Sequence, residues 1–279
     1  MMEITASLVK ELRDETNLGM MECKKALQET NGDKEAAIRL LRERGLSLAD
    51  KRAGRAAKEG RVAMEIYDGG KAGVMIEVNC ETDFVAKNEN FQSFVDSLVS
   101  QAHDAADDEL AVVAKDAVVA KIAEIGENIV IRRNVRYTTS GSGAVAGYIH
   151  LGGKVGVLVE IACDKDASVQ QDAFKDALKD ITLHIAACSP QFLSRSEIPA
   201  EVVAAEREIY AKQVEGKPEN IIEKIVGGKL DKFYSQICLE EQGYVKDPDQ
   251  TITQFLAATG KTLGDTLKIR RFTRYQVGA

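Results

Sequence analysis

Three short runs in the first 45 residues repeat apolar positions at helical spacing. The runs are marked by Leu8, Val9 and Leu12, then by Met21, Ala26 and Leu27, then by Ala37, Ile38 and Leu41. The segment Asn17-Leu18-Gly19 separates the first two, Asn31-Gly32 ends the second, and Asp33 is a typical N-cap for the third. Gly45 is expected to stop the third helix. The pattern predicts a three-helix unit over residues 1–45, small enough to serve as a docking domain.

The pattern that follows is an internal repeat. Residues 62–78 align without gaps on residues 145–161, each containing two β-rich runs around a Gly-Gly pair. The register continues through Cys80 with Cys163 and Asp83 with Asp166, and a later segment, 126–137, matches 264–275. The core is therefore a duplicated unit.

Each copy predicts a β-hairpin, then helices, then one more strand. The expected fold class is α+β, with two small three-stranded antiparallel sheets carrying helices on one face. A long insertion in the second copy predicts an antiparallel helical hairpin at about 199–241, with a weak point at Gly227-Gly228. Its expected seam consists of Ile209, Ile221, Ile225, Phe233 and Ile237. The predicted domains are 1–45 (docking domain), 46–60 (basic linker), 61–140 (first copy) and 141–279 (second copy with the hairpin).

The net charge of −7 is unevenly distributed. Residues 1–61 carry 13 basic and 11 acidic side chains, a net of +2, and the remainder carries 24 basic and 33 acidic ones, a net of −9. The basic residues between Arg42 and Arg61 fit either a linker helix in solvent or a contact with RNA or an acidic partner. An acidic chain argues against a protein that coats nucleic acid.

Cysteine spacing and hydropathy exclude several further classes of protein. The chain has five cysteines, far apart and without a C-x-x-C pair, so neither a disulfide framework nor a zinc site is expected. No apolar stretch reaches the roughly 18 residues of a membrane span, and the first residues do not form a signal pattern. We expect a soluble cytoplasmic protein without a membrane partner.

Signals for catalysis are weak. Gly260-Lys261-Thr262 resembles the end of a P-loop, but Phe255 stands where the first glycine is required. The histidines, His103, His150 and His184, are far apart and form no metal-ligand or triad pattern. The sequence therefore predicts no catalytic residue, no metal site and no cofactor of its own.

Comparing the two copies singles out one aromatic residue. Asp83 and Asp166 occupy the same place and are expected to help cap the following helix, whereas Phe84 is replaced by Ala167. Phe84 fits two interpretations equally, a hydrophobic staple of one subdomain or a projecting anchor for a partner. His150, before the second Gly-Gly turn, is either solvated or in reach of a partner. Cys80 and Cys163 are expected to be buried structural thiols.

Two long motifs resemble a known family. The segment 77–87, Glu-Val-Asn-Cys-Glu-Thr-Asp-Phe-Val-Ala-Lys, is similar to the signature of the elongation factor Ts family, guanine-nucleotide exchange factors for elongation factor Tu. Leu12-Arg13, Thr16 and the segment 19–27 resemble a second signature, in which Asn17 replaces the usual glycine. The resemblance covers essentially the whole chain and implies a ubiquitin-associated-like N-terminal domain, a duplicated core and a helical hairpin.

The resemblance also implies a function in translation. Such a protein promotes GDP release and GTP rebinding on elongation factor Tu, is not an enzyme, and acts on the Mg²⁺ and GDP of its partner. The implied exchange residues are Thr82, Asp83, Phe84 and Val85, with the Asp-Phe pair intruding beside the partner's Mg²⁺ site. Further contacts are implied at Lys24, Lys51, Arg52, Ile125 and His150. No direct contact with nucleic acid is expected, and a homodimer through the core or the hairpin is left open.

Two hypotheses from other classes remain. An RNA- or ribosome-associated adaptor would use the basic stretch from Arg42 to Arg61, and its affinity would fall steeply with salt. A hydrolase would use Glu81 and Asp83 as paired carboxylates and would turn over a small substrate without a partner.

Overall fold

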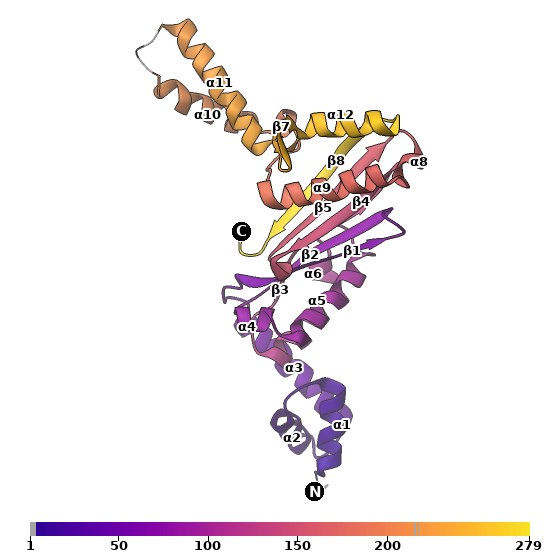
Figure 1. The fold of residues 1–279 in the computed structure, drawn as a ribbon. Coiled ribbons are helices and arrows are strands. Elements are labelled where there is room, and N and C mark those ends of the chain that lie inside the picture. The colour runs from indigo at the N-terminus through magenta and orange to yellow at the C-terminus, as the bar shows by residue number, and fades with distance from the viewer. Residues whose placement is uncertain (1–3, 215, 217) are drawn as a thin grey trace.

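Three helices form the N-terminal end of the molecule, as the apolar spacing predicts. The computed structural model describes residues 4–214, 216 and 218–279, and Figure 1 shows these helices at one end of an elongated chain. They are α1 (Ala6–Thr16), α2 (Met20–Glu29) and α3 (Lys34–Arg52). The side chain of Asp33 caps α3 by accepting from the backbone N–H of Ala36 at 2.9 Å, as expected. Leu12, Leu27 and Leu41 pack in the small core between the three helices.

The expectation that Gly45 stops the third helix is wrong. Helix α3 continues through Gly45 to Arg52, so the first part of the expected 46–60 linker is helical. Gly45 faces α7 (Lys115–Ile125), where a Cβ on Gly45 would lie 3.3 Å from the Cβ of Ala123. The glycine serves a close approach of two helices rather than a helix end.

The duplicated core forms two three-stranded antiparallel sheets, as the repeat predicts. Their strand orders are β1-β2-β3 and β4-β5-β8. The strands are β1 (Glu59–Tyr67), β2 (Ala72–Cys80), β3 (Val130–Thr138), β4 (Gly143–His150), β5 (Val155–Cys163) and β8 (Leu267–Gln276). Each sheet has one register shift, at Glu77/Val78 and at Glu160/Ile161, which are equivalent repeat positions. The duplication therefore extends to an irregularity of the backbone.

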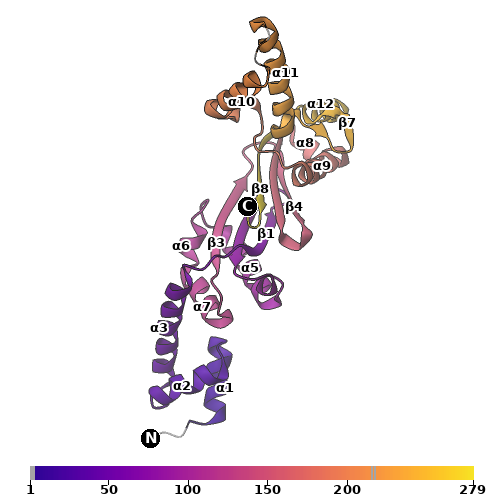
Figure 2. The same cartoon turned by 90° about the vertical axis from the view of Figure 1, so that its left-hand side faces the viewer.

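The two sheets pack against each other, a contact that the repeat alone does not predict. Side chains of both sheets, among them Val62, Met75, Val145 and Leu158, form one cluster between them. A Cβ on Gly156 would lie 2.4 Å from Val62 Cγ1, so only glycine allows this approach. The other face of each sheet is covered by helices, and Figures 1 and 2 show the resulting helix–sheet–sheet–helix stack.

The helices on the two outer faces follow the repeat as well. The first copy has α4 (Asp83–Ala86), α5 (Glu89–Ala102), α6 (Leu110–Val113) and α7, and the second has α8 (Asp166–Val169), α9 (Asp172–Cys188) and α12 (Ile252–Leu263). Phe91 of α5 and Phe174 of α9 are buried at equivalent places beneath their sheets. Short turns of 3-10 helix cover Leu151–Gly153, Arg195–Glu197 and Leu239–Glu241.

Reciprocal side-chain contacts join the two copies across the sheet interface. The Arg133 guanidinium lies 4.1 Å from the centre of the Tyr275 ring, and Arg271 lies 4.0 Å from that of Tyr137. Each arginine also binds a buried glutamate of its own sheet, Arg133 to Glu77 at 2.7 Å and Arg271 to Glu160 at 2.8 Å. The same three residue types, arginine, tyrosine and glutamate, therefore meet twice, related by the duplication.

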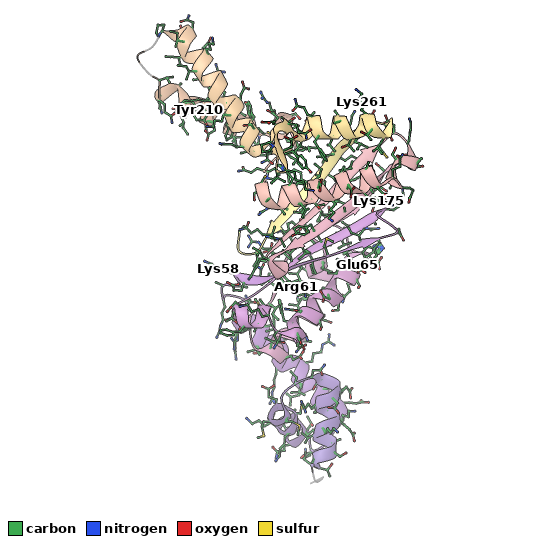
Figure 3. All side chains as sticks on the ribbon, in the orientation of Figure 1. Lys58, Arg61, Glu65, Lys175, Tyr210 and Lys261 are labelled. Carbon is green, nitrogen blue, oxygen red and sulfur yellow. The ribbon has the colours of Figure 1, made fainter. Side chains whose placement is uncertain are left out.

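The insertion of the second copy projects from the core as two helices and a small ribbon. Its elements are α10 (Ala200–Lys212), α11 (Glu219–Ile237), β6 (Gly243–Tyr244) and β7 (Asp247–Thr251). Figure 3 labels Tyr210 on α10, which packs with Val214 and Val226 between the two helices. Of the expected seam, Ile225, Phe233 and Ile237 pack in the clusters of this arm, whereas Ile209 and Ile221 are 48% and 43% exposed. Hydrophobicity alone could not separate the packed stripe from its flanks.

Gly227 and Gly228 lie inside α11, which continues through them. A Cβ at either position would meet no atom within 4 Å. We expect Gly228→Ala to raise the free energy of unfolding of the helical arm by about 0.5–1 kcal/mol, because alanine restricts the unfolded chain and favours helix. Chemical denaturation monitored by circular dichroism tests this. Gly156→Ala should instead lower the free energy of unfolding, because its Cβ would clash with Val62 between the sheets. A higher free energy of unfolding in both variants would contradict the packing of the two sheets.

His184 of α9 is fully buried and fastens the end of the insertion to the core. Its Nδ1 accepts from the backbone N–H of Val245 at 3.2 Å, so Nε2 carries the proton and donates to Gln242 Oε1 at 2.9 Å. Burial lowers the pKa of His184. The unfolded chain therefore binds an extra proton once the pH falls below the ordinary imidazole value of about 6.5.

We expect the free energy of unfolding to decline as the pH falls from about 6.5 through the lower pKa of folded His184, and the stabilising contribution to be complete above that window. Urea unfolding at a series of pH values measures this slope. The His184→Asn variant should show a weaker slope over the same window, and an identical slope in both proteins would remove His184 as its source.

Candidate functional site

A short helix carries the residues singled out at the first strand-to-helix corner. Strand β2 ends at Cys80, and α4 starts at Asp83. Thr82 is the N-cap of α4, since its Oγ1 accepts from the backbone N–H of Val85 at 3.3 Å. The expectation that Asp83 provides the cap is therefore wrong by one residue. Asp83 occupies the first turn, where its negative charge favours the N-terminal end of the helix.

The side chain of Phe84 projects into solvent. It is 83% exposed, whereas its neighbour Ala86 is buried and Val85 packs against the core of the first copy. This excludes the staple interpretation, because a staple residue is covered by the helix that it fastens. In the second copy, α8 has the same four-residue length but carries Ala167 at this place. An exposed aromatic residue that one copy alone carries favours the anchor interpretation.

Asp83 is an ionised neighbour of this aromatic ring. Lys87 Nζ donates to Asp83 Oδ2 at 2.7 Å and lowers the pKa of the carboxyl group. The pair is exposed, so its energy of interaction is small. The site thus offers an aromatic ring beside a carboxylate and an ammonium group.

Two carboxylates fix the corner that precedes α4. Glu127 accepts from the backbone N–H groups of Glu81 and Thr82 at 3.0 and 3.1 Å, and from the Thr82 hydroxyl at 2.7 Å. In return, Glu81 accepts from the backbone N–H of Asn128 at 2.7 Å, which lowers the pKa of Glu81. Glu127 is not among the site residues predicted from the sequence, although Glu127 and Asp265 stand at equivalent repeat positions.

The geometry gives no support to the hydrolase hypothesis. Glu81 binds Asn128 and lies 3.5 Å from Arg52 and 3.4 Å from Arg55, while Asp83 binds Lys87. Both carboxylates therefore have structural partners. A carboxyl group that acts as a general acid needs a raised pKa. The pKa values of Glu81 and Asp83 are both lowered instead.

Two of the further predicted residues lie near the α4 corner. Arg52 is half-buried at the end of α3 and pairs with Glu81, which gives it an internal partner instead of the free surface position expected of a contact residue. Ile125 ends α7 and packs against the core of the first copy, two residues before Glu127. Lys51 precedes Arg52 on α3 and is exposed.

Lys24 and His150 occupy separate surfaces. Lys24 is exposed on α2, in the N-terminal three-helix unit. His150 is exposed at the end of β4, where its Nδ1 lies 3.0 Å from the Tyr148 hydroxyl. The next residue, Leu151, is 70% exposed. The fold therefore spreads the predicted contacts from the N-terminal helices to the tip of β4.

Most of the basic stretch is engaged in ion pairs. The pairs are Arg42–Asp116, Arg44–Glu29, Arg52–Glu81, Arg55–Glu81 and Arg61–Asp96. Figure 3 labels Lys58 and Arg61, which mark the entry into β1. These carboxylates offset the positive charge that an RNA phosphate backbone would need.

The described residues contain no group of three or more His, Cys, Asp or Glu side chains that could hold a metal ion. Within the same part of the chain, no helix is both long and apolar enough to cross a membrane. Cys80 and Cys163 are buried, and each Sγ donates to a backbone carbonyl two residues on, at 3.2 and 3.3 Å. The prediction of structural thiols at these equivalent places is confirmed.

Comparisons with known proteins agree with the motifs. A family model described as elongation factor TS matches residues 81–279. The chain is 50% identical to elongation factor Ts of Trichlorobacter lovleyi, over 99% of this chain and 93% of the relative. It is 46% identical to elongation factor Ts of a Nitratiruptor species, over 99% and 94%, and 44% identical to that of Clostridium botulinum, over 99% and 93%.

Proposed function

The chain belongs to the elongation factor Ts family, and we propose that it acts as the guanine-nucleotide exchange factor of elongation factor Tu in translation elongation. The proposal rests on the exposure of Phe84. Phe84 lies within the family signature, directly after the corner whose Thr82 is held by Glu127. The protein works by binding another protein, and it needs no catalytic residue or cofactor of its own. The expected cytoplasmic location follows from this role, since elongation factors act where ribosomes translate.

The proposed mechanism uses Asp83 and Phe84 as an intruding pair. A GTPase holds GDP through backbone N–H groups, a lysine and Mg²⁺, so an exchange factor must weaken these contacts. The Phe84 ring would enter beside the Mg²⁺ site of the partner, and the Asp83 carboxylate would disturb the groups around the metal. Thr82 and Val85 flank the pair and shape the contact. Each 1.4 kcal/mol of weakening lowers nucleotide affinity about tenfold.

Thermodynamic linkage sets the behaviour of the complex. If binding of this chain lowers the partner's affinity for GDP by a given factor, bound GDP lowers the partner's affinity for this chain by the same factor. The complex is therefore tight without nucleotide and dissociates when nucleotide rebinds. Such coupling lets one exchange factor serve many partner molecules in turn.

The remaining predicted residues extend the proposed interface. Lys24 on the N-terminal unit, which we take to be ubiquitin-associated-like, would contact the GTPase domain, and Lys51, Ile125 and His150 would border the core contact. Arg52 acts on this interface through Glu81. We regard α10 and α11 as an antiparallel hairpin that serves as an accessory or dimerisation arm, and we expect no direct contact with nucleic acid.

Release of fluorescent GDP from purified elongation factor Tu tests the function. The wild-type chain should accelerate release in a concentration-dependent way. An unchanged rate at saturating chain would refute the proposal. Salt-sensitive binding of this chain to RNA, without acceleration of GDP release, would support the adaptor hypothesis instead.

A further inference from the structure

The corner before α4 is fixed from outside α4 itself. Glu127 follows Gly126, which ends α7 in the left-handed conformation with φ 82°. Its carboxylate accepts three hydrogen bonds from Glu81 and Thr82, the two residues that precede α4. Bonds to a charged acceptor are among the stronger hydrogen bonds in proteins. Glu127 thus sets the direction in which the chain enters the helix that carries Phe84.

The clamp is reciprocal and extends to the N-terminal unit. Glu81 binds the backbone N–H of Asn128, so each of the two segments gives a carboxylate to the backbone of the other. The Glu81 carboxylate also pairs with Arg52 and Arg55, at the end of α3 and just beyond it. The Asn128 side chain adds a bond to the carbonyl of Arg55 at 2.8 Å. Three parts of the chain therefore converge on the corner.

The second copy contains the matching half of the clamp, a carboxylate that binds the backbone before α8, without the aromatic residue. Asp265 accepts from the backbone N–H groups of Asp164 and Lys165 at 3.0 and 3.1 Å, and from the Ser168 hydroxyl. The helix that follows carries Ala167 where the first copy carries Phe84. The duplication thus separates two roles: both clamps hold a corner of the fold, and only the Glu127 clamp also aims an exposed aromatic ring.

We propose that Glu127 is a positioning residue for nucleotide exchange, which presents Phe84 to the partner by fixing the backbone of Glu81 and Thr82. The proposal rests on the exchange function given above, since Glu127 can affect exchange only if Phe84 contributes to it. A fixed corner reduces the conformational entropy that the loop loses when Phe84 enters beside the Mg²⁺ site of the bound partner, so loss of the clamp slows exchange within the complex. Glu127 itself touches neither nucleotide nor metal.

The first experiment examines the free protein. The chain contains no tryptophan, so Phe84→Trp places its one tryptophan at the site. In this background, Glu127→Gln should lower the residual anisotropy of the tryptophan, because the amide presents an N–H where the clamp needs an acceptor. Asp265→Asn, the matched change in the second copy, should leave the anisotropy unchanged. Equal anisotropy with and without Glu127→Gln would overturn the proposal.

The second experiment measures GDP release from elongation factor Tu over a range of chain concentrations. Glu127→Gln should lower the maximal rate about tenfold, the effect of losing one charge-assisted bond, without changing the half-saturating concentration. A general loss of folded protein would shift the half-saturating concentration instead. Glu127→Asp should recover part of the rate, as Asp265 performs the same task in the second copy.

Two further variants separate the clamp from the exchange function. Asp265→Asn should keep the wild-type maximal rate, and Glu127→Gln should cause no further loss in a Phe84→Ala background. A wild-type maximal rate in Glu127→Gln, or an equal loss in Asp265→Asn, would overturn the positioning role while leaving the exchange function intact. A wild-type rate in Phe84→Ala would instead overturn the role of Phe84 on which the proposal rests.

Discussion

Replacing Phe84 by alanine will slow GDP release from elongation factor Tu by about 10- to 100-fold at a fixed concentration of chain, the loss typical of an aromatic anchor at an interface. The thermal stability of the free protein will stay nearly unchanged, because the ring is 83% exposed and Phe84→Ala leaves no cavity. Stopped-flow release of a fluorescent GDP analogue and a thermal melt measure the two effects.

Matched controls make this result specific. Val112 on α6 is also strongly exposed, at 78%, and Val112→Ala should leave exchange unaffected. Ala167→Phe places an aromatic ring on the second copy and should not restore activity to Phe84→Ala, because the surroundings of α8 differ. Full activity of Phe84→Ala would mean that exposure of the ring has no part in exchange.

Removing the Arg133 side chain should have the largest effect on stability. Arg133→Ala leaves Glu77, which is fully buried, with the Asn79 amide as its remaining side-chain partner at 3.1 Å. An uncompensated buried charge costs about 3–5 kcal/mol, and the stacking on Tyr275 is lost as well. Urea denaturation should show a lower midpoint with both sheets unfolding together, since their shared core is disturbed.

The equivalent arginine of the second copy provides the control. Arg271→Ala should cost less, because Arg270 still lies 3.8 Å from Glu160. A double change, Glu77→Gln with Arg133→Met, should be milder than Arg133→Ala alone, since it leaves no buried charge. If Arg133→Ala were as stable as the wild type, the ion pair would contribute nothing to the joining of the two sheets.

The duplicated sheets could be predicted because their signals are local. A Gly-Gly turn between two β-rich runs predicts a hairpin, and finding it twice fixes the copy number. The packing of one sheet on the other is a contact between distant residues such as Val62 and Gly156, and a single sequence does not show it. The apolar positions along β2 and β5, buried on both faces, were the available sign.

At the site, too, local features could be predicted from the sequence and contacts between distant residues could not. The motif around Phe84 was visible in the sequence, but a staple and an anchor have the same residues and differ only in what covers them. Glu127 escaped notice because its role depends on a backbone bend 45 residues away, at Thr82. Gly45 was misassigned because a glycine inside a helix and a glycine that ends one look alike until the partner helix is known.

The continuity of α3 bears on how tightly a partner can be held. The helix has 19 residues and spans about 28 Å, from the N-terminal unit to the corner beside Phe84. A rigid spacer of this kind makes binding bivalent under the proposed function: once one end is engaged, the other is presented at a high effective concentration. Two modest contacts then act as one strong one, and the partner can dissociate stepwise by releasing either end first.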